Sequence, residues 1–272
     1  MPPPLVTLTT DFGTLDPYVA QMKGVLLSLV PEVHIHDLSH AIPAGDIRAG
    51  ALFVEAAVAR FPSYAVHLVV VDPGVGGRRR PMALWTSLGT LVGPDNGLFS
   101  AFFGRPEARA VVLDRREHWA ATVSHTFHGR DVFAPVAARL ASGLAVDEVG
   151  SPLPDPVRLH LPRPLPVHEG IDGEVIHVDH FGNLVTNIPA DLLSQGREEP
   201  SAVEADWLGH RIRGPYPSYD SVPEGAPLIV VGSTGRIEIS VNRGRADAIL
   251  GGGVGSRVRL RRVPQPARGH GS

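Results

Sequence analysis

The first half of the chain alternates between short apolar runs and longer stretches with helical spacing. Runs rich in β-branched residues occupy residues 5–8, 33–37 and 65–71, and residues typical of turns bound each of them. Between these runs, residues 18–30 and 46–60 repeat apolar side chains at the spacing of an amphipathic helix. This strand–helix order predicts an α/β domain with a doubly wound, mostly parallel sheet.

Cap chemistry supports the expected helices. Asp16 with Pro17 marks the start of the first helix, and Asp46 marks the start of the second. Further elements of the same domain are expected as strands at residues 82–85, 90–92 and 110–113 and as a helix at residues 131–140.

The second half has a different composition. Six prolines interrupt residues 151–170, at positions 152, 154, 156, 162, 164 and 166. Proline removes a backbone donor, so this stretch cannot form a central strand or a helix interior and is expected to be an extended linker. Short β-type segments follow, at residues 173–178, 184–188, 201–203, 211–213, 228–231, 236–241 and 257–263. Such spacing favours a small β-barrel or sandwich.

The expected domain organisation follows from this change. An α/β domain covers residues 1–150, the proline-rich linker covers residues 151–170, and a smaller β domain covers residues 171–272. The polar tail from residue 264 is expected to be loose.

Composition excludes several classes of function. A net charge of -3 gives no electrostatic reason to expect nucleic acid or an anionic membrane as a partner. The absence of cysteine excludes a thiolate nucleophile, a disulfide and a zinc–thiolate site. Lys23 is the only lysine, so any Schiff base would have to use it. Because neither a membrane-length apolar stretch nor a basic signal-peptide start is present, the cytoplasm is the expected location.

Asp72 stands at the end of the apolar run 65–71. A glycine turn follows it and leads to Arg78, Arg79 and Arg80. In open α/β sheets, ligands bind beyond the carboxyl ends of the strands. A carboxylate followed by guanidinium groups therefore predicts a site for a polar substrate. An Asp-Pro turn with a surface ion pair is the alternative interpretation.

Three more polar loops, residues 11–16, 126–131 and 179–183, are expected to carry chemistry. A carboxylate such as Asp11 at a strand end can hold a ribose diol. For His128 taken alone, an ordinary exposed or hydrogen-bonded imidazole is the favoured interpretation.

Five segments together resemble one known family. They are Thr10-Asp11-Phe12-Gly13, Val19-Ala20-Gln21-Met22-Lys23-Gly24, Asp72-Pro73-Gly74-Val75-Gly76, Phe127-His128-Gly129-Arg130-Asp131 and Asp179-His180-Phe181-Gly182-Asn183. The family is the S-adenosyl-L-methionine hydroxide adenosyltransferases, which also include the fluorinase and chlorinase enzymes. The resemblance is collinear from about residue 5 to residue 262.

The resemblance implies an α/β N-terminal domain joined to a β-barrel C-terminal domain. It also implies a homotrimer that binds its substrate between neighbouring subunits. The implied reaction is attack of a water-derived nucleophile on C5′ of S-adenosyl-L-methionine, which releases adenosine and L-methionine and needs no cofactor.

By motif register, the resemblance places the catalytic groups on Asp72, Arg79 and His128. A register slip of one residue would move the guanidinium to Arg78 or Arg80. These residue types suit the reaction, because a sulfonium leaves as a neutral thioether and only the nucleophile needs activation. Arg79 cannot act as a base but can stabilise hydroxide by its charge. Either His128 accepts the proton while Asp72 orients it, or Asp72 is the base and His128 holds the water.

The resemblance also implies substrate contacts. It assigns the ribose to Asp11, the adenine to Phe181, Asn183 and Tyr219, the wall around C5′ to Phe127, and the methionine ammonium to Asp179 and Ser233. Thr234 stands where the fluorinase has an arginine for the methionine carboxylate.

Two departures from the halogenases favour hydrolysis over a halide-using adenosyl transfer. Asp72 replaces their tyrosine, and Gly129 replaces the fluorinase serine that helps to hold fluoride. A carboxylate at close range repels a halide by about 1 kcal/mol or more.

Two further hypotheses belong to other classes. A metal-dependent hydrolase could use His34, His36 and His40, but the first two alternate along an expected strand and the third follows a turn, which favours a structural role. A non-catalytic protein that binds an adenosyl ligand would not need the three catalytic groups, and all three are present.

Overall fold

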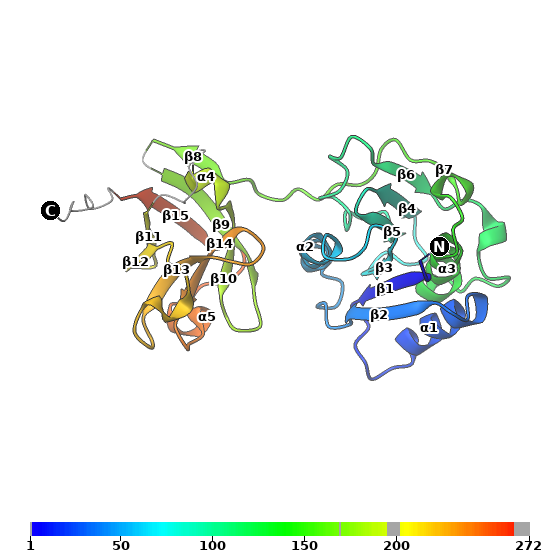
Figure 1. The fold of residues 1–272 in the computed structure, drawn as a ribbon, viewed down its shortest axis with the longest axis horizontal. Coiled ribbons are helices and arrows are strands. Elements are labelled where there is room, and N and C mark those ends of the chain that lie inside the picture. Colours follow the sequence, from blue (N-terminus) through cyan, green and yellow to red (C-terminus); the bar gives the residue numbers. More distant parts are fainter. Residues whose placement is uncertain (1, 169, 195–201, 264–272) are drawn as a thin grey trace. The chain divides into compact units, whose positions relative to one another are not determined.

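The computed structural model describes residues 2–168, 170–194 and 202–263. The chain forms two compact units, Met1–His160 (unit 1) and Leu161–Ser272 (unit 2), each with its own sheet and core (Figure 1). The division between them falls within residues 151–170. The tail expected to be loose, residues 264–272, lies outside the described residues.

Unit 1 is built on a seven-stranded sheet. Its strand order is β2-β1-β3-β5-β4-β6-β7, with bounds β1 Leu5–Thr10, β2 His34–Ser39, β3 Val66–Val70, β4 Pro81–Thr86, β5 Gly89–Pro94, β6 Arg109–Val112 and β7 Ser151–Pro152. The first four strands in this order pair in parallel, and the remaining pairs are antiparallel. The parallel half contains the fully buried strands β1 and β3, as expected for strands covered on both faces.

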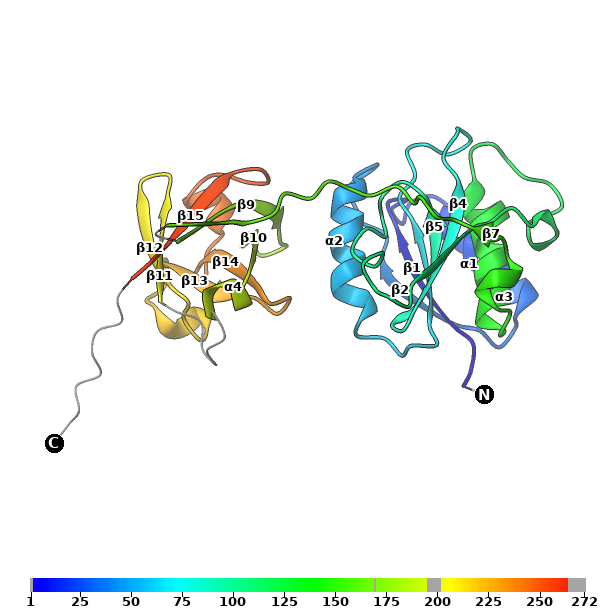
Figure 2. The ribbon, with the colours of Figure 1, turned by 90° about the horizontal axis from the view of Figure 1, so that it is seen from above.

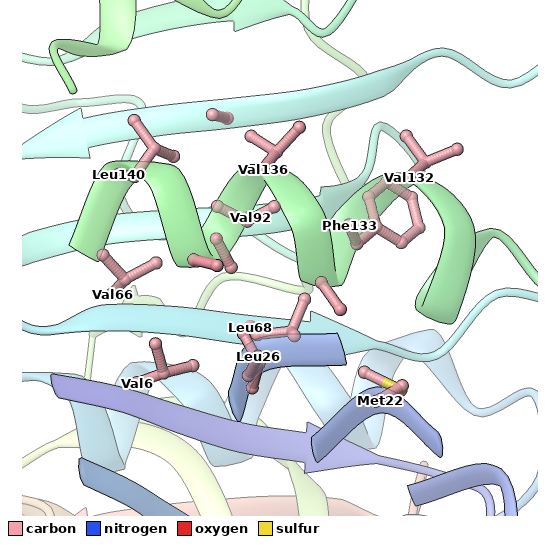
Figure 3. Close-up of a cluster of buried hydrophobic side chains, with 14 of the residues drawn as sticks. Val6, Met22, Leu26, Val66, Leu68, Val92, Val132, Phe133, Val136 and Leu140 are labelled. Carbon is pink, nitrogen blue, oxygen red and sulfur yellow. The ribbon is translucent and has the colours of Figure 1, made fainter. Parts of the chain in front are cut away.

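Helices cover both faces of this sheet, which confirms the predicted α/β fold. Figure 2 shows α2 (Ile47–Val58) on one side and α1 (Tyr18–Leu29) with α3 (Ala134–Ala141) on the other. Neighbouring residues of β3 point to opposite faces. Leu68 lies in the core with the α1 and α3 side chains drawn in Figure 3, whereas Val69 packs in the core on the α2 face.

The helix starts differ in how they are capped. Asp46 caps α2 as predicted, since its Oδ1 accepts a hydrogen bond from Ala49 N at 2.9 Å. The prediction for the first helix is wrong in detail. Pro17 occupies the cap position of α1, and no side chain caps that end.

The helix expected at residues 131–140 starts two residues earlier, and its first part is a π-helix instead of an α-helix. A π-helical segment, Gly129–Phe133, precedes α3. Pro135 lies near the α3 N-terminus, where its missing N–H interrupts the regular hydrogen-bond ladder. Short π-helical segments of this kind are frequent at functional sites.

Unit 2 is a small β-barrel. The main path of its sheet runs β12-β11-β15-β9-β10-β14-β13, and β8 pairs with β9 beside this path. The bounds are β8 Leu165–Val167, β9 Gly170–Val178, β10 Leu184–Pro189, β11 Val203–Trp207, β12 His210–Gly214, β13 Pro227–Val231, β14 Arg236–Val241 and β15 Arg257–Arg262. Beyond β12, Tyr216 N donates to Ile229 O of β13 at 2.8 Å, which draws the two end strands together. Trp207 and Ile229 lie among the buried residues of this core.

The prolines occupy positions that a sheet tolerates. Pro152 lies in the edge strand β7, and Pro166 lies in β8, which pairs only with β9 in the described chain. Within the described residues, no helix has the length and apolar character needed to span a membrane.

Candidate active site

Two carboxylates follow adjacent parallel strands of unit 1. Strands β1 and β3 are in register, with Thr10 opposite Val70. Asp11 therefore follows β1 directly and Asp72 lies two residues beyond β3, at the same edge of the sheet. Asp11 Oδ2 accepts a hydrogen bond from Gly45 N at 2.7 Å, which fixes this carboxylate against the loop that leads to α2. The edge matches the usual ligand-binding position in open α/β sheets.

Asp72 forms a bidentate ion pair with Arg79. The Arg79 Nε lies 2.9 and 3.0 Å from the two carboxylate oxygens, and Arg79 Nη2 makes a further short contact with Oδ2. The side chains are only 9% and 4% exposed for Arg79 and Asp72, respectively. The guanidinium also lies over the Phe133 ring, 5.2 Å from its centre. A buried pair of this kind is costly to break, because removal of one partner leaves the other charge uncompensated.

His128 completes this cluster through the same guanidinium. Arg79 Nη2 lies 2.8 Å from His128 Nδ1. Since arginine only donates hydrogen bonds, Nδ1 is the acceptor, and the proton of the neutral imidazole lies on Nε2. Burial and then the positive charge of Arg79 lower the pKa of His128 below its ordinary 6.5, despite opposing contributions from Asp72 and Asp131. The cluster therefore favours a neutral imidazole.

The neighbouring arginines have other contacts. Arg80 pairs with Asp95 at 2.7 Å and with Asp155 at 2.8 Å. Arg78 is exposed. Of the three consecutive arginines, Arg79 is thus the one that contacts both Asp72 and His128.

The His128 loop is anchored by an ion pair on the following residues. Arg130 Nε lies 2.6 Å from Asp131 Oδ1, and Asp131 Oδ2 accepts a hydrogen bond from Ser124 N at 2.8 Å. Burial opposes the ionisation of Asp131, yet these hydrogen bonds hold its pKa below the ordinary 3.8. The loop also packs tightly. A Cβ on Gly129 would lie 3.2 Å from both Met22 Sδ and a Phe127 ring carbon.

Phe127 is 9% exposed and belongs to an aromatic cluster. Its ring packs edge-to-face against Phe12 and Tyr18, with centroid distances of 5.9 and 5.3 Å. The cluster joins the loop after β1 to the loop that carries His128.

In unit 2, Asp179 and Asn183 are bonded to each other. Asp179 Oδ1 accepts a hydrogen bond from Asn183 N, and Oδ2 accepts one from Asn183 Nδ2, both at 2.8 Å. Gly182 adopts a φ of +86° in this tight loop between β9 and β10. Asn183 is 6% exposed, so this hydrogen-bonded pair is largely shielded from solvent on the Asn183 side.

Aromatic and polar groups surround this pair. Phe181 is 72% exposed and Tyr219 is 43% exposed, which leaves ring surface free to stack on a ligand. The Tyr219 hydroxyl donates to Glu238 Oε2 at 3.3 Å. Ser233 is exposed in the turn between β13 and β14.

Two residues of these clusters were not predicted from the sequence. Asp131 appears in a matched motif, but its anchoring role requires the contacts with Arg130 and Ser124. Glu238 stands between isoleucines in β14, and strand alternation alone would place it on the outer, exposed face. It is instead 7% exposed.

Of the histidines considered as metal ligands, His40 has other partners. His40 Nδ1 lies 2.9 Å from Thr10 Oγ1, and its Nε2 lies 3.1 Å from Asp37 Oδ1. His34 and His36 belong to β2. Over the described parts of the chain, no group of three or more His, Asp or Glu side chains has an arrangement that could hold a metal ion.

Comparisons with known proteins agree with the two-unit organisation. The family model described as the SAM hydroxide adenosyltransferase N-terminal domain matches residues 6–150, and the model of the C-terminal domain of the same family matches residues 173–259. A protein of Salinispora tropica named (R)-S-adenosyl-L-methionine hydrolase is 42% identical over 269 residues, which cover 95% of this chain and 98% of that protein.

The chain is also similar to a fluorinase and to a protein of known structure. A fluorinase of an Actinoplanes species is 32% identical over 215 residues, or 68% of this chain and 72% of that enzyme. The crystal structure of an uncharacterized conserved protein from Thermotoga maritima superposes with a TM-score of 0.88 at 32% identity and covers 94% of this chain and 100% of that one.

Proposed function

Because the chain belongs to the S-adenosyl-L-methionine hydroxide adenosyltransferase family, we propose that it hydrolyses S-adenosyl-L-methionine to adenosine and L-methionine. The observation that carries this proposal is the cluster at the carboxyl edge of the unit 1 sheet, in which the buried side chains of Asp72 and Arg79 pair and Arg79 contacts the half-buried His128. The name of the Salinispora relative supports the substrate and the reaction type.

The proposed reaction is a displacement at C5′. The C5′–S bond breaks and its electrons stay on sulfur, which turns the sulfonium into the neutral thioether of methionine. A water oxygen bonds to C5′, and the water proton passes to the enzyme. The leaving group needs no general acid, so the catalytic groups act on the nucleophile.

Arg79 links the two groups that can accept this proton, His128 Nδ1 and the Asp72 carboxylate. We assign the proton to His128 Nδ1. His128 Nδ1 accepts one hydrogen bond from Arg79, whereas the Asp72 carboxylate accepts three. Protonation of Asp72 would therefore weaken more hydrogen bonds than protonation of His128. When Nδ1 takes the proton, the released Arg79 N–H turns to the new hydroxide and stabilises its charge. Asp72 holds the guanidinium in place during this exchange.

The substrate contacts remain proposals based on the matched motifs. Asp11 binds the ribose diol, and its fixed position supports this role. Phe181 and Tyr219 stack on adenine, which their exposed rings permit, and Asn183 recognises the base. Phe127 lines the wall near C5′, and Asp179 and Ser233 bind the methionine ammonium.

Assembly as a homotrimer, with substrate bound between neighbouring subunits, is also a proposal that rests on the family. We also propose, on the same basis, that the reaction needs no cofactor and that the protein is cytoplasmic. S-adenosyl-L-methionine and adenosine are the proposed ligands, with neither nucleic acid nor membrane as a partner.

Product analysis tests the proposed function. The purified protein is incubated with S-adenosyl-L-methionine, with or without chloride, fluoride or EDTA, and the products are separated by chromatography. Formation of adenosine under all conditions is expected, with Asp72→Asn and His128→Ala strongly impaired. A 5′-halogenated nucleoside as the main product would assign the protein to the halide branch. Activity lost in EDTA and restored by a divalent ion would indicate a metal hydrolase, and binding without turnover would indicate a non-catalytic protein.

A further inference from the structure

Glu238 is a buried carboxylate that has no cationic partner among the described residues. It lies on β14 and is 7% exposed. The Tyr219 hydroxyl, 3.3 Å from Oε2, is its only hydrogen-bond partner among the described residues. The other oxygen, Oε1, lies against the backbone of Gly232, where an added Cβ would be only 1.7 Å away. Gly232 directly precedes Ser233, so this oxygen lies beside the turn assigned to the methionine end of the substrate.

The surroundings of Glu238 add negative charge. Burial, and then the nearby charge of Asp179, raise the pKa of Glu238. Burial and the charge of Glu238 also raise the pKa of Tyr219 to about 12, so the Tyr219 hydroxyl stays a neutral donor. Hydrogen bonding to Asp247 and the charge of Asp247, and then the charge of Asp179, raise the pKa of Arg245, and this guanidinium is paired with Asp247 at 2.8 Å.

Two carboxylates thus share one region of unit 2 without a matching cation from the described part of the chain. A buried carboxylate that lacks a cation is costly, and a ligand that brings a positive charge removes that cost. The exposed rings of Phe181 and Tyr219 beside the pair show that this region is open to a ligand.

We infer that Glu238, together with Asp179, is the counter-charge for the α-ammonium group of S-adenosyl-L-methionine. This inference rests on the proposed function. The substrate has two cationic groups. The sulfonium is bonded to C5′ and belongs beside the nucleophile, which leaves the ammonium for the carboxylates of unit 2. Neither adenine nor ribose carries a charge that would require a second carboxylate. Glu238 is a specificity-determining residue in this arrangement, because it selects substrates with a free amino group.

The test combines a charge-neutral variant with a substrate analogue. Glu238→Gln keeps the size of the side chain and removes its charge. With S-adenosyl-L-methionine, we expect KM to rise about 10- to 100-fold, as for loss of a charged hydrogen bond, and kcat to change little because the group is remote from C5′. With the sulfonium analogue that lacks the α-amino group, wild type and Glu238→Gln should have equal kcat/KM.

Two controls separate this effect from a general defect. Glu224→Gln removes an exposed carboxylate of unit 2, which is 70% exposed and pairs with Arg243, and it should leave all constants unchanged. Adenosine affinity, measured by calorimetry, should be equal in wild type and Glu238→Gln, which shows that the variant is folded.

Each outcome has a distinct meaning. A Glu238→Gln penalty that persists with the desamino analogue would overturn the inference. A penalty that disappears with the substrate analogue lacking the adenine N6 amino group would instead place Glu238 at the base, and would also overturn it. Failure of the wild type to form adenosine would contradict the proposed function itself, whatever the variant does.

Discussion

Arg79 is the centre of the proposed chemistry because it holds a carboxylate on one side and an imidazole on the other. The contact at 2.8 Å makes His128 Nδ1 an acceptor, so the residue rests in its neutral form with a lone pair directed at a cation. Nδ1 can take a proton once the Arg79 N–H leaves it, and that N–H is then free to stabilise the hydroxide that results.

His128→Ala should therefore reduce turnover far more than binding. Loss of a general base typically lowers kcat by about 10²- to 10⁴-fold, whereas adenosine affinity should stay within a few-fold of wild type. Steady-state kinetics and calorimetry on the same preparation give both values. A proportional loss of turnover and affinity would make His128 a binding or folding residue instead.

The pH dependence follows from the direction of the His128 pKa. Burial and Arg79 lower this pKa, with Asp72 and Asp131 opposing and His125 adding to the decrease. A base must be neutral, so kcat/KM should fall only as pH drops through the lowered pKa, and more than half of the plateau should remain at pH 6.5. The measurement is a profile of kcat/KM against pH. A half-maximal point at or above pH 6.5 would contradict this role for His128.

At the scale of elements, two loops create the cluster by direct packing. Gly76, in the loop after β3, has a φ of +73°, and a Cβ at this position would lie 2.2 Å from His125 O in the loop that carries His128. No side chain fits between these loops. The close approach of Gly76 to His125 O therefore fixes the distance between Arg79 and His128, which lie in the same two loops but outside this contact.

Gly76→Ala should consequently disturb both stability and catalysis. The left-handed backbone alone costs about 1–2 kcal/mol for a residue with a Cβ, and displacement of the loops should lower kcat by about 10- to 100-fold. Gly104→Ala is the matched control, because Gly104 has open space around its Cβ position. Thermal denaturation and kinetics report the two effects. Wild-type turnover in Gly76→Ala would mean that the loop contact does not position the cluster.

The sequence predicted strands and helices better than it predicted the contacts and burial of their side chains. The run 236–241 was expected as a strand and is β14, because alternating β-branched residues are a local signal. The π-helical segment at Gly129–Phe133 has no such signal, since it depends on Pro135 and on packing against α1. Burial of Glu238 was missed for the same reason: Tyr219 and Gly232, which cover it, come from other parts of the barrel. The contact of Arg79 with both Asp72 and His128 likewise required three-dimensional placement.

The two units of the molecule carry different kinds of candidate substrate-handling residues. Unit 1 carries the groups that act on water, and unit 2 carries exposed aromatic rings and carboxylates suited to the two ends of the substrate. Separate hydrophobic cores support the two sets of residues.

The proposed trimer gives a direct expectation. Sedimentation velocity should show a species of about three times the 29.0 kDa chain at the concentrations used for kinetics, and activity per chain should fall on dilution where the trimer dissociates. A fully active monomer would exclude a substrate site that depends on a second subunit.

The attack of activated water on C5′ is tested most directly by turnover in water enriched in oxygen-18. Mass spectrometry of the products should show one heavy oxygen in adenosine, at its 5′ position, and none in L-methionine. Unlabelled adenosine, or label in the amino acid, would contradict the displacement that Asp72, Arg79 and His128 are proposed to catalyse.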